Sequence, residues 1–420
     1  MTNHREDTTD SPTLAVDLQD ERLVHEEGLG GAARAFGTRI RSGNLGSLPI
    51  VIGLILIAIV FQILNSHFLS ANNLVNLTLQ SAATGTIALG VVVVLLVAQI
   101  DLSVGSISGL SSAILGVTFA NNGWPAWLSI VFALAIGVAI GLLYGYLFTQ
   151  FGVPTFVATL AGLLGFLGLQ LWVLGPNGTI NLPYDSWVVQ FATATFLPPW
   201  LAYLLAGVAV VGVIVADLAR GRRRRAAGLS VRSHSIVVVK ALALALVSAV
   251  AIAYLATDRG VGAMFLLFIV LVAIVAYLLT RTRWGRAIYA VGGNVEAARR
   301  AGINVKAIYT SALTLGTTLA ALGGLLAAAR LTAASISSGG GTTNLVAIAA
   351  AVIGGTSLFG GRGSAWSALI GILVIQAIAN GLTLLSLSSA VQFMVTGAVL
   401  LLAVIVDSLS RRSRATHGQA

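Results

Sequence analysis

Long apolar runs, separated by short polar segments, constrain the fold of this chain more than any other feature of its sequence. The chain has 420 residues, of which 57% are hydrophobic and only 9% are charged. A water-soluble protein usually carries about 25% charged residues, because even a large globule needs a polar surface. Lipid must therefore surround most of the folded chain. The sequence predicts an all-α bundle of membrane-spanning helices.

Twelve apolar runs are long enough, or nearly long enough, to cross a membrane. A helix needs about 20 apolar residues to cross a hydrocarbon core about 30 Å thick. The runs are residues 48–64, 79–98, 104–120, 127–148, 153–174, 196–215, 236–255, 261–279, 307–331, 345–358, 365–385 and 390–406. The tenth run is short and rich in glycine, so we expect a broken or re-entrant helix there, enclosed by protein or a cavity. The sequence thus predicts a transmembrane bundle of about 10–12 spans.

Basic residues form four clusters, and an even number of apolar runs separates each cluster from the next. The clusters are Arg34, Arg39 and Arg41, then Arg220–Arg225 with Arg232, then the stretch Arg281–Lys306, and finally Arg411, Arg412 and Arg414. Cytoplasmic loops carry the excess of Lys and Arg in membrane proteins. All four clusters and both termini are therefore predicted to face the cytoplasm.

The run of arginines from Arg220 to Arg225 has two possible interpretations. The run Arg220–Arg225 resembles a nucleic-acid-binding patch when it is read alone. Its place between two apolar runs favours an orientation signal and a loop that contacts lipid headgroups, so we expect no nucleic-acid partner.

Residues 1–30 hold eight acids and two arginines, a net charge of −6. We therefore predict a mostly disordered acidic tail over residues 1–46, a transmembrane domain over 47–410 and a second cytoplasmic tail over 411–420.

Several kinds of chemistry are excluded or disfavoured. The chain has no cysteine, so disulfides, zinc–thiolate sites and thiol catalysis are excluded. All five histidines lie outside the apolar runs, which disfavours a buried metal site. No group of acids, histidines or serines within the runs has catalytic spacing. We therefore expect neither an enzyme nor a cofactor.

The source of energy for transport stays open at this point. Ion- and proton-coupled carriers usually place ionisable residues within the bundle, where the coupling ion binds. Asp101, at a break between two runs, is the acid in this chain that could do so. ATP would need another subunit, because a Walker A loop requires a Lys after a glycine-rich turn, and neither Lys240 nor Lys306 has that context.

A basic loop at residues 281–306 contains a short helix with both ends marked. It reads RTRWGRAIYAVGGNVEAARRAGINVK. The signals are Asn294 as N-cap, Glu296 in the first turn, Arg299 and Arg300 in the last turn, and Gly302 at the end. Such a helix either docks in a groove on a partner or lies on the lipid headgroups, and its periodicity favours neither.

Two further segments stand out. Residues 344–364 read NLVAIAAAVIGGTSLFGGRGS, and Gly354, Gly355, Gly360 and Gly361 permit either tight helix packing or a kinked backbone along a path. Residues 99–105 read QIDLSVG. There, Asp101 is expected to cap a helix that opens at Leu102. Gly105, four residues before Gly109, starts a GxxxG packing signal.

These three segments together resemble the permeases of the ribose/xylose class of ABC sugar importers. The blocks IDLSVG, GRAIYAVGGN with AARRAGI, and AIAAAVIGGTSLFGGRGS occur in that order in this family. The resemblance covers residues 48–410 and is strongest to the xylose-type permeases. Many relatives have about ten spans, and the additional pair of runs flanks the stretch from Arg220 to Lys240.

The resemblance implies a function and a set of partners. The chain would be the permease subunit of an importer in a bacterial inner membrane, translocating a monosaccharide, a pentose such as xylose. A homodimer of this chain would form the path, a separate cytoplasmic ATP-binding subunit would hydrolyse ATP, and an extracytoplasmic sugar-binding protein would deliver the sugar. From the residues alone, a proton-linked sugar carrier that uses Asp101 stays the alternative.

The resemblance and the chemistry of sugars also suggest site residues. Coupling to the ATP-binding subunit would involve Gly285, Arg286, Gly292, Asn294, Glu296, Ala298, Arg299, Arg300 and Gly302. A neutral sugar suits a path lined by amide, hydroxyl and aromatic side chains, for which the candidates are Gln99, Phe156, Gln170, Trp172, Thr317, Asn380 and Gln392. Each of these seven is also compatible with ordinary helix packing.

Cysteine labelling tests the predicted topology on this cysteine-free chain. We expect an impermeant maleimide to label Tyr184→Cys from outside the cell and Arg222→Cys only after the cytoplasmic side is opened, because basic loops stay inside. Labelling of Arg222→Cys from outside alone would show that the number of spans is wrong.

Overall fold

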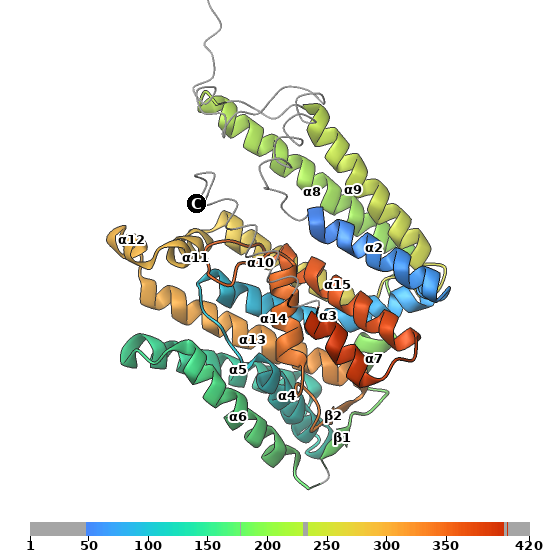
Figure 1. Ribbon diagram of the computed structural model, residues 1–420, viewed down its shortest axis with the longest axis vertical. Coiled ribbons are helices and arrows are strands. Elements are labelled where there is room, and N and C mark those ends of the chain that lie inside the picture. The colour runs from blue at the N-terminus through green and yellow to red at the C-terminus, as the bar shows by residue number, and fades with distance from the viewer. Residues whose placement is uncertain (1–47, 177, 230–233, 399–400, 402–420) are drawn as a thin grey trace, which may run out of the picture. The chain divides into compact units, whose positions relative to one another are not determined.

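Helices make up almost all regular structure in the described residues, which are 48–176, 178–229, 234–398 and 401 of a computed structural model (Figure 1). The elements are α2 (Leu48–Leu64), α3 (Ala71–Leu96), α4 (Val104–Leu115), the π-helix η2 (Gly116–Asn121), α5 (Ala126–Phe151), α6 (Thr155–Leu174), β1 (Thr179–Asn181), α7 (Trp187–Thr193), α8 (Pro199–Ala226), α9 (His234–Leu255), α10 (Ala263–Arg281), α11 (Arg283–Gly293), α12 (Val295–Arg300), α13 (Val305–Leu331), β2 (Ala333–Ser335), α14 (Thr343–Ile353) and α15 (Trp366–Leu384). Within these residues, nine helices are long and apolar enough to span a membrane, and two more apolar helices are shorter. The predicted all-α transmembrane bundle is confirmed.

The described residues form two compact units. One contains Pro199–Ala253, which is the hairpin of α8 and α9 without the last two residues of α9. The other holds the remaining helices, and its centre is α13, which packs against α3, α4 and α5. In this second unit, the most apolar stretch of α3 is 89% buried and that of α13 is 72% buried. The span formed by α4 and η2 is 78% buried, so these helices together form the core around which the other spans pack.

Small residues allow the core helices to approach each other closely. A Cβ atom at Gly90 of α3 would lie 2.6 Å from the carbonyl oxygen of Gly316 of α13. Between helices in lipid, association depends on such close packing, because the surrounding acyl chains are as apolar as the side chains. At this position, glycine therefore allows close contact between α3 and α13.

The tenth predicted run, 345–358, falls on α14, one of the two shorter apolar helices, which ends at Ile353 before the run does. After α13, the strand β2 pairs antiparallel with β1, with Ile180 opposite Ala334. The chain then continues through residues 336–342, which we call the re-entrant segment, into α14, which ends at Ile353. Ser338 and Gly339 lie against Gly109 and Gly105 of α4, which is a candidate span.

Some predicted boundaries are wrong. The run predicted over 196–215 is α8, which extends to Ala226 and carries the arginines of Arg220–Arg225 on helix rather than in a loop. Helix α3 begins at Ala71, eight residues before the predicted run, because asparagines in its first turns find partners elsewhere in the fold. The helix α7, the π-helix and the two strands were not predicted. The predicted tails and part of the run 390–406 lie outside the described residues.

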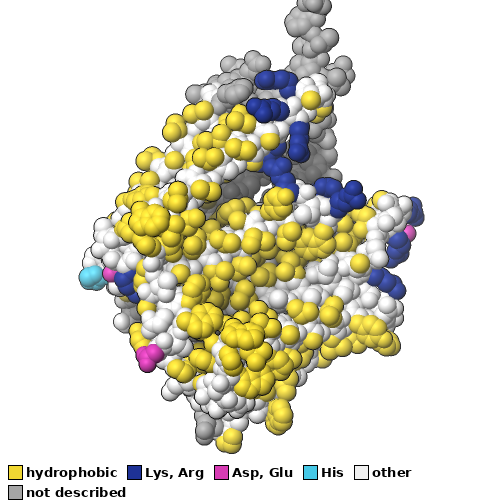
Figure 2. All heavy atoms as spheres, turned by 180° about the vertical axis from the view of Figure 1, so that it is seen from behind, with side chains coloured by type: hydrophobic (Ala, Val, Ile, Leu, Met, Phe, Trp, Pro, Cys, Tyr) yellow, Lys and Arg dark blue, Asp and Glu magenta, His cyan; other side chains and the backbone are white. Residues whose placement is uncertain are grey.

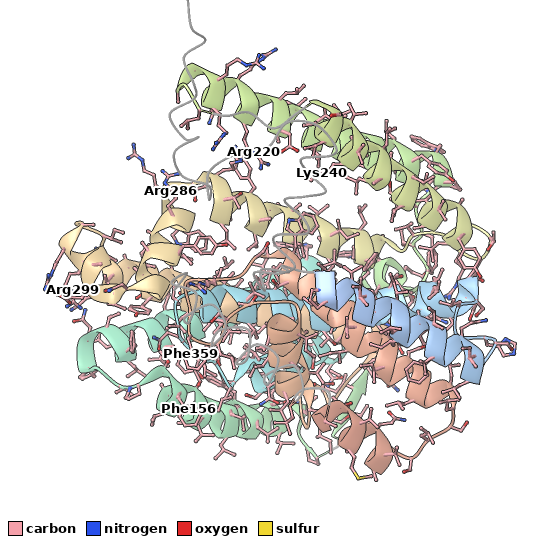
Figure 3. The ribbon with its side chains drawn as sticks, turned by 45° about the horizontal axis from the view of Figure 1, so that its top comes forward. Phe156, Arg220, Lys240, Arg286, Arg299 and Phe359 are labelled. Carbon is pink, nitrogen blue, oxygen red and sulfur yellow. The ribbon has the colours of Figure 1, made fainter. Side chains whose placement is uncertain are left out.

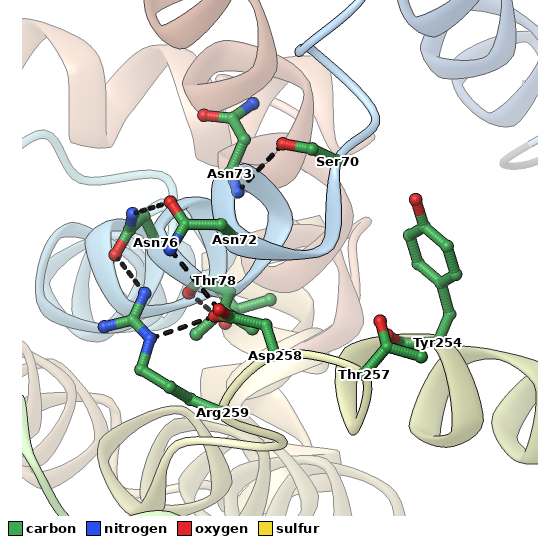
Figure 4. Close-up of polar contacts among 10 residues, drawn as sticks. Ser70, Asn72, Asn73, Asn76, Thr78, Tyr254, Thr257, Asp258 and Arg259 are labelled. Carbon is green, nitrogen blue, oxygen red and sulfur yellow. Dashed lines mark hydrogen bonds and ion pairs between the residues drawn. The ribbon is translucent and has the colours of Figure 1, made fainter.

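The first turns of α3 are fixed to the segment before α10 by a polar cluster (Figure 4). Asn72 donates to Asp258 over 3.4 Å, and Arg259 donates to Asn76 over 2.8 Å. Arg259 also pairs with Asp258 over 3.0 Å, and this hydrogen bond is the main reason why the pKa of the Asp258 carboxyl is lowered. The cluster explains why a polar stretch can begin a membrane helix.

Two glycine substitutions test how tightly the core is packed. We expect Gly90→Ala to lower the free energy of unfolding by about 1 to 3 kcal/mol, because the new methyl group meets the Gly316 carbonyl. Gly165→Ala on α6 is the matched control, since nothing lies within 4 Å of its Cβ position. Thermal melting in detergent measures both. Equal melting temperatures for the two variants would contradict the packing described here.

Candidate functional site

Two of the segments that the sequence singled out, 281–306 and 344–364, meet at the C-terminal end of α3, directly before the third segment, 99–105. The amide N–H of Gly361 donates to the carbonyl oxygen of Leu96 over 2.9 Å. Gly292 lies so close that a Cβ atom there would overlap the same oxygen, and Gly360 lies against Ala98 and the carbonyl of Gly292. We call these five residues, Leu96, Ala98, Gly292, Gly360 and Gly361, the glycine junction. It joins three stretches of chain by backbone contact.

The backbone conformation at the junction requires small residues. Gly360 and Gly361 have φ of +80° and +69°. The left-handed region costs L-residues with a Cβ atom roughly 1 to 2 kcal/mol. Ala98 adopts it nevertheless, with φ of +58°. Substitution of either glycine would therefore strain the backbone as well as crowd the junction.

Helix α12 has the capped ends that the sequence predicts. The side chain of Asn294 accepts a hydrogen bond from the N–H of Ala297 over 2.9 Å. At the other end, Gly302 has φ of +79° and donates to the carbonyl of Arg299. Glu296 pairs with Arg299 over 3.0 Å, and Figure 3 shows Arg299 projecting away from the bundle. The protruding turn is therefore preformed.

Helix α11 fixes that turn to the rest of the second unit. Trp284 donates to Ser311 of α13 over 2.8 Å, and Tyr289 donates to the carbonyl of Gly363 over 3.0 Å. Gly285 and Ala298 are buried, whereas Arg286 is exposed. The loop thus has an inner side that packs and an outer side that carries charge. In Figure 2, Lys and Arg side chains gather at the edge where α11 and α12 lie, beside a broad hydrophobic face.

Asp101 is not the N-cap residue of α4, contrary to the prediction. Helix α4 begins at Val104 instead of Leu102, and its N-cap residue is Ser103. Asp101 accepts hydrogen bonds from the backbone N–H of Ser103 over 2.7 Å and from its hydroxyl over 2.6 Å. Tyr144 of α5 donates to the same hydroxyl over 2.8 Å. Asp101 is 2% exposed, and its Oδ2 has no hydrogen-bond partner among the described residues.

The seven residues suggested for a sugar path lie at different places in the second unit. Thr317 is buried and donates to the carbonyl of Gly137, and Asn380 exchanges hydrogen bonds with Asn73. The other five are Gln99 bonded to Thr155, Gln392 bonded to the carbonyl of Leu387, the exposed Phe156 and Trp172, and the buried Gln170. An apolar cleft lined by Ala349, Ile353, Ile375, Ile378 and Thr396 includes none of them. The arrangement described here brings no group of them together.

Gln170 shows a role that sequence reasoning missed. Its side-chain N–H groups donate to the carbonyls of Ser335 and Ser338 over 3.0 and 2.9 Å. The fully buried amide thus satisfies backbone carbonyls on either side of the turn that enters the re-entrant segment. The sequence signal for that segment is the small, polar stretch ISSGGGTT, which interrupts two apolar runs. Nothing in it identifies Gln170 as the partner.

Comparison with known proteins finds similarity over most of the chain. The family model "Branched-chain amino acid transport system / permease component" matches residues 73–404. The xylose transport system permease protein XylH of Escherichia coli strain K12 is 36% identical over 374 residues, which are 89% of this chain and 94% of that protein. XylH of Haemophilus influenzae is 34% identical over 375 residues, 89% of this chain and 99% of that protein. The ribose import permease protein RbsC of Bacillus subtilis is 33% identical over 365 residues, 87% of this chain and 94% of that protein. No solved structure matches the chain.

Two substitutions separate the geometry of Asp101 from its charge. We expect Asp101→Asn to leave stability nearly unchanged, because an amide oxygen can accept from the Ser103 N–H as the carboxylate does. Asp101→Leu leaves the buried N–H of Ser103 without its acceptor and should lower stability by about 1 to 3 kcal/mol. Thermal melting of the purified variants distinguishes them. An equal loss in both would show that the charge itself is required.

Proposed function

We propose, from the fact that this chain belongs to the permease-component family whose model matches residues 73–404, that it is the membrane subunit of an ATP-driven monosaccharide importer. The relatives named above are xylose and ribose permeases, and they match the chain over almost their whole length. The observation that carries the proposal is the glycine junction. It connects a preformed, outward-facing turn to the membrane core, as a driven permease needs.

The proposed substrate is a pentose such as xylose. The relatives with the highest identities among those named are xylose permeases. A neutral sugar binds through hydroxyl and amide groups and needs no fixed charge. The seven path residues stay proposals for this role, and their separation implies that they line a path only after the helices rearrange.

A separate ATP-binding subunit is proposed to dock on α11 and α12. The exposed Arg286, Glu296, Arg299 and Arg300 would contact it, because they lie on the outer side of the loop. Gly285, Gly292 and Ala298 would position the loop, because they are buried against the second unit. Asn294 and Gly302 would hold the turn in shape through the caps. ATP hydrolysis would then occur outside this chain, and this subunit would not be an enzyme.

A second copy of this chain is proposed to cover the re-entrant segment. Ser337, Gly341 and Thr342 are exposed, and we propose that they lie at membrane depth because their neighbours Ser338 and Gly339 contact the candidate span α4. Irregular backbone is tolerated there only against protein or a water-filled path. A homodimer with this segment at its interface would supply both. An extracytoplasmic sugar-binding protein would meet the opposite end from α12, and both termini would lie in the cytoplasm.

A proton-linked carrier is the second candidate function. The supporting observation is Asp101, which is 2% exposed and has a carboxylate oxygen without a hydrogen-bond partner among the described residues. Radiolabelled xylose uptake in proteoliposomes decides between the two functions. We expect uptake only when the ATP-binding subunit, the binding protein and ATP are present. Uptake by this chain alone, driven by a proton gradient, would overturn the importer.

A proline substitution in α12 tests whether the backbone shape of the loop 281–306 is needed to couple the permease to ATP hydrolysis. We expect Ala298→Pro to leave the permease inserted but to abolish stimulation of ATP hydrolysis by the sugar-loaded binding protein. Proline removes the hydrogen bond from the Ala298 N–H to the Asn294 carbonyl and costs about 3 kcal/mol in a helix interior. The double change Arg299→Ala with Arg300→Ala should be milder, since exposed charge contacts contribute about 0 to 1 kcal/mol each. The reverse order would indicate that the loop lies on headgroups.

The proposed dimer can be tested by crosslinking. Ser337→Cys should give covalent dimers with a flexible bis-maleimide, because the re-entrant segment would face its copy. Leu246→Cys on α9, which is 66% exposed and apolar, is the control and should remain monomeric. Denaturing gels of crosslinked membranes report the result. Monomers from both variants would exclude this interface.

A further inference from the structure

The end of the α8–α9 hairpin carries a dense group of basic residues. Between Pro199 and Ala253 the sequence has seven Lys and Arg residues and a single acid, Asp217. Five of the basic residues lie on the last two turns of α8. The proposed transport function uses none of them.

Asp217 forms ion pairs with two of these basic residues, Arg220 and Lys240. Its carboxylate lies 3.5 Å from Arg220 and 3.6 Å from Lys240 of α9, and its side chain is 7% exposed. Figure 3 labels Arg220 and Lys240 on the two helices. The ion pair therefore joins the helices of the hairpin. Arg222, Arg223 and Arg225 are exposed and have no ion pair with any described residue.

Within its own unit, the helix below these arginines is apolar and exposed. Only 6% of the most apolar stretch of α8 is buried. Val211 and Val215, which precede Asp217, are 57% and 58% exposed. From Asp217 to Arg225 the helix rises about 12 Å, at 1.5 Å per residue. The exposed guanidinium groups therefore lie just beyond the apolar surface of this candidate span.

We propose that this end of the hairpin binds an anionic phospholipid, with the headgroup phosphate on Arg222, Arg223 and Arg225 and the acyl chains along α8. Guanidinium groups bind phosphate oxygens in a bidentate manner and are weakly hydrated, so they suit such a ligand. A soluble phosphate or an acidic peptide would use the charges but leave the adjoining apolar surface without a partner. A lipid satisfies both.

Lipid titration of the purified full chain tests the proposal. Phosphatidylglycerol or phosphatidylcholine is added to the protein in a neutral detergent, and bound lipid is counted by native mass spectrometry. We expect phosphatidylglycerol to bind preferentially. The triple variant Arg222→Gln, Arg223→Gln, Arg225→Gln should bind it roughly 100-fold more weakly, since each arginine near an anionic surface contributes about fivefold.

Two further variants serve as controls for the lipid titration. Arg283→Gln with Arg299→Gln and Arg300→Gln removes the same charge from α11 and α12 and should retain binding. Replacement of the three α8 arginines by lysine should restore most of it, and equal melting temperatures in phosphatidylcholine show that the variants are folded. Equal binding of the two lipids, an equal loss in the α11–α12 variant, or displacement by equimolar glycerol phosphate would overturn the proposal.

Discussion

The contact on which the rest of the site depends is the hydrogen bond from the Gly361 amide to the Leu96 carbonyl. This bond holds the loop after α14 against the end of α3, and Gly292 brings α11 to the same oxygen. Because all three stretches meet through backbone atoms, a shift of one must move the others. Side chains could yield by changing rotamer, whereas contacting backbone cannot. The junction is therefore a rigid connection between the protruding turn and the core.

The membrane imposes a second constraint on the same region. Broken backbone at membrane depth leaves polar groups that lipid cannot satisfy. Gln170 satisfies the carbonyls of Ser335 and Ser338, and Asn344 donates to the carbonyl of Leu102 over 3.2 Å. The segment before α14 is thus held from α6 and from the turn before α4. Its remaining exposed residues need a protein or water cover, which is why we place a second copy there.

Local features of the fold were predictable from the sequence, and long-range contacts were not. The caps of α12 follow from the spacing of Asn294 and Gly302, which is local information. The bond of Tyr144 to Ser103 joins residues 41 positions apart, and no local pattern shows it. The same limit explains α3, whose polar start depends on Asp258 and Arg259. The segments 281–306 and 344–364 were recognisable in the sequence, but only their folded positions show that they meet at the end of α3.

The most direct test of the rigid junction compares two neighbouring glycines. A Cβ atom at Gly292 would overlap the Leu96 carbonyl, whereas nothing lies within 4 Å of the Cβ position at Gly293. The measurement is ATP hydrolysis in proteoliposomes that contain the permease, the ATP-binding subunit and the sugar-loaded binding protein. We predict that Gly292→Ala loses most of the stimulation while the ATP-binding subunit still co-purifies, and that Gly293→Ala behaves as the unsubstituted chain. Full stimulation in Gly292→Ala would contradict the account.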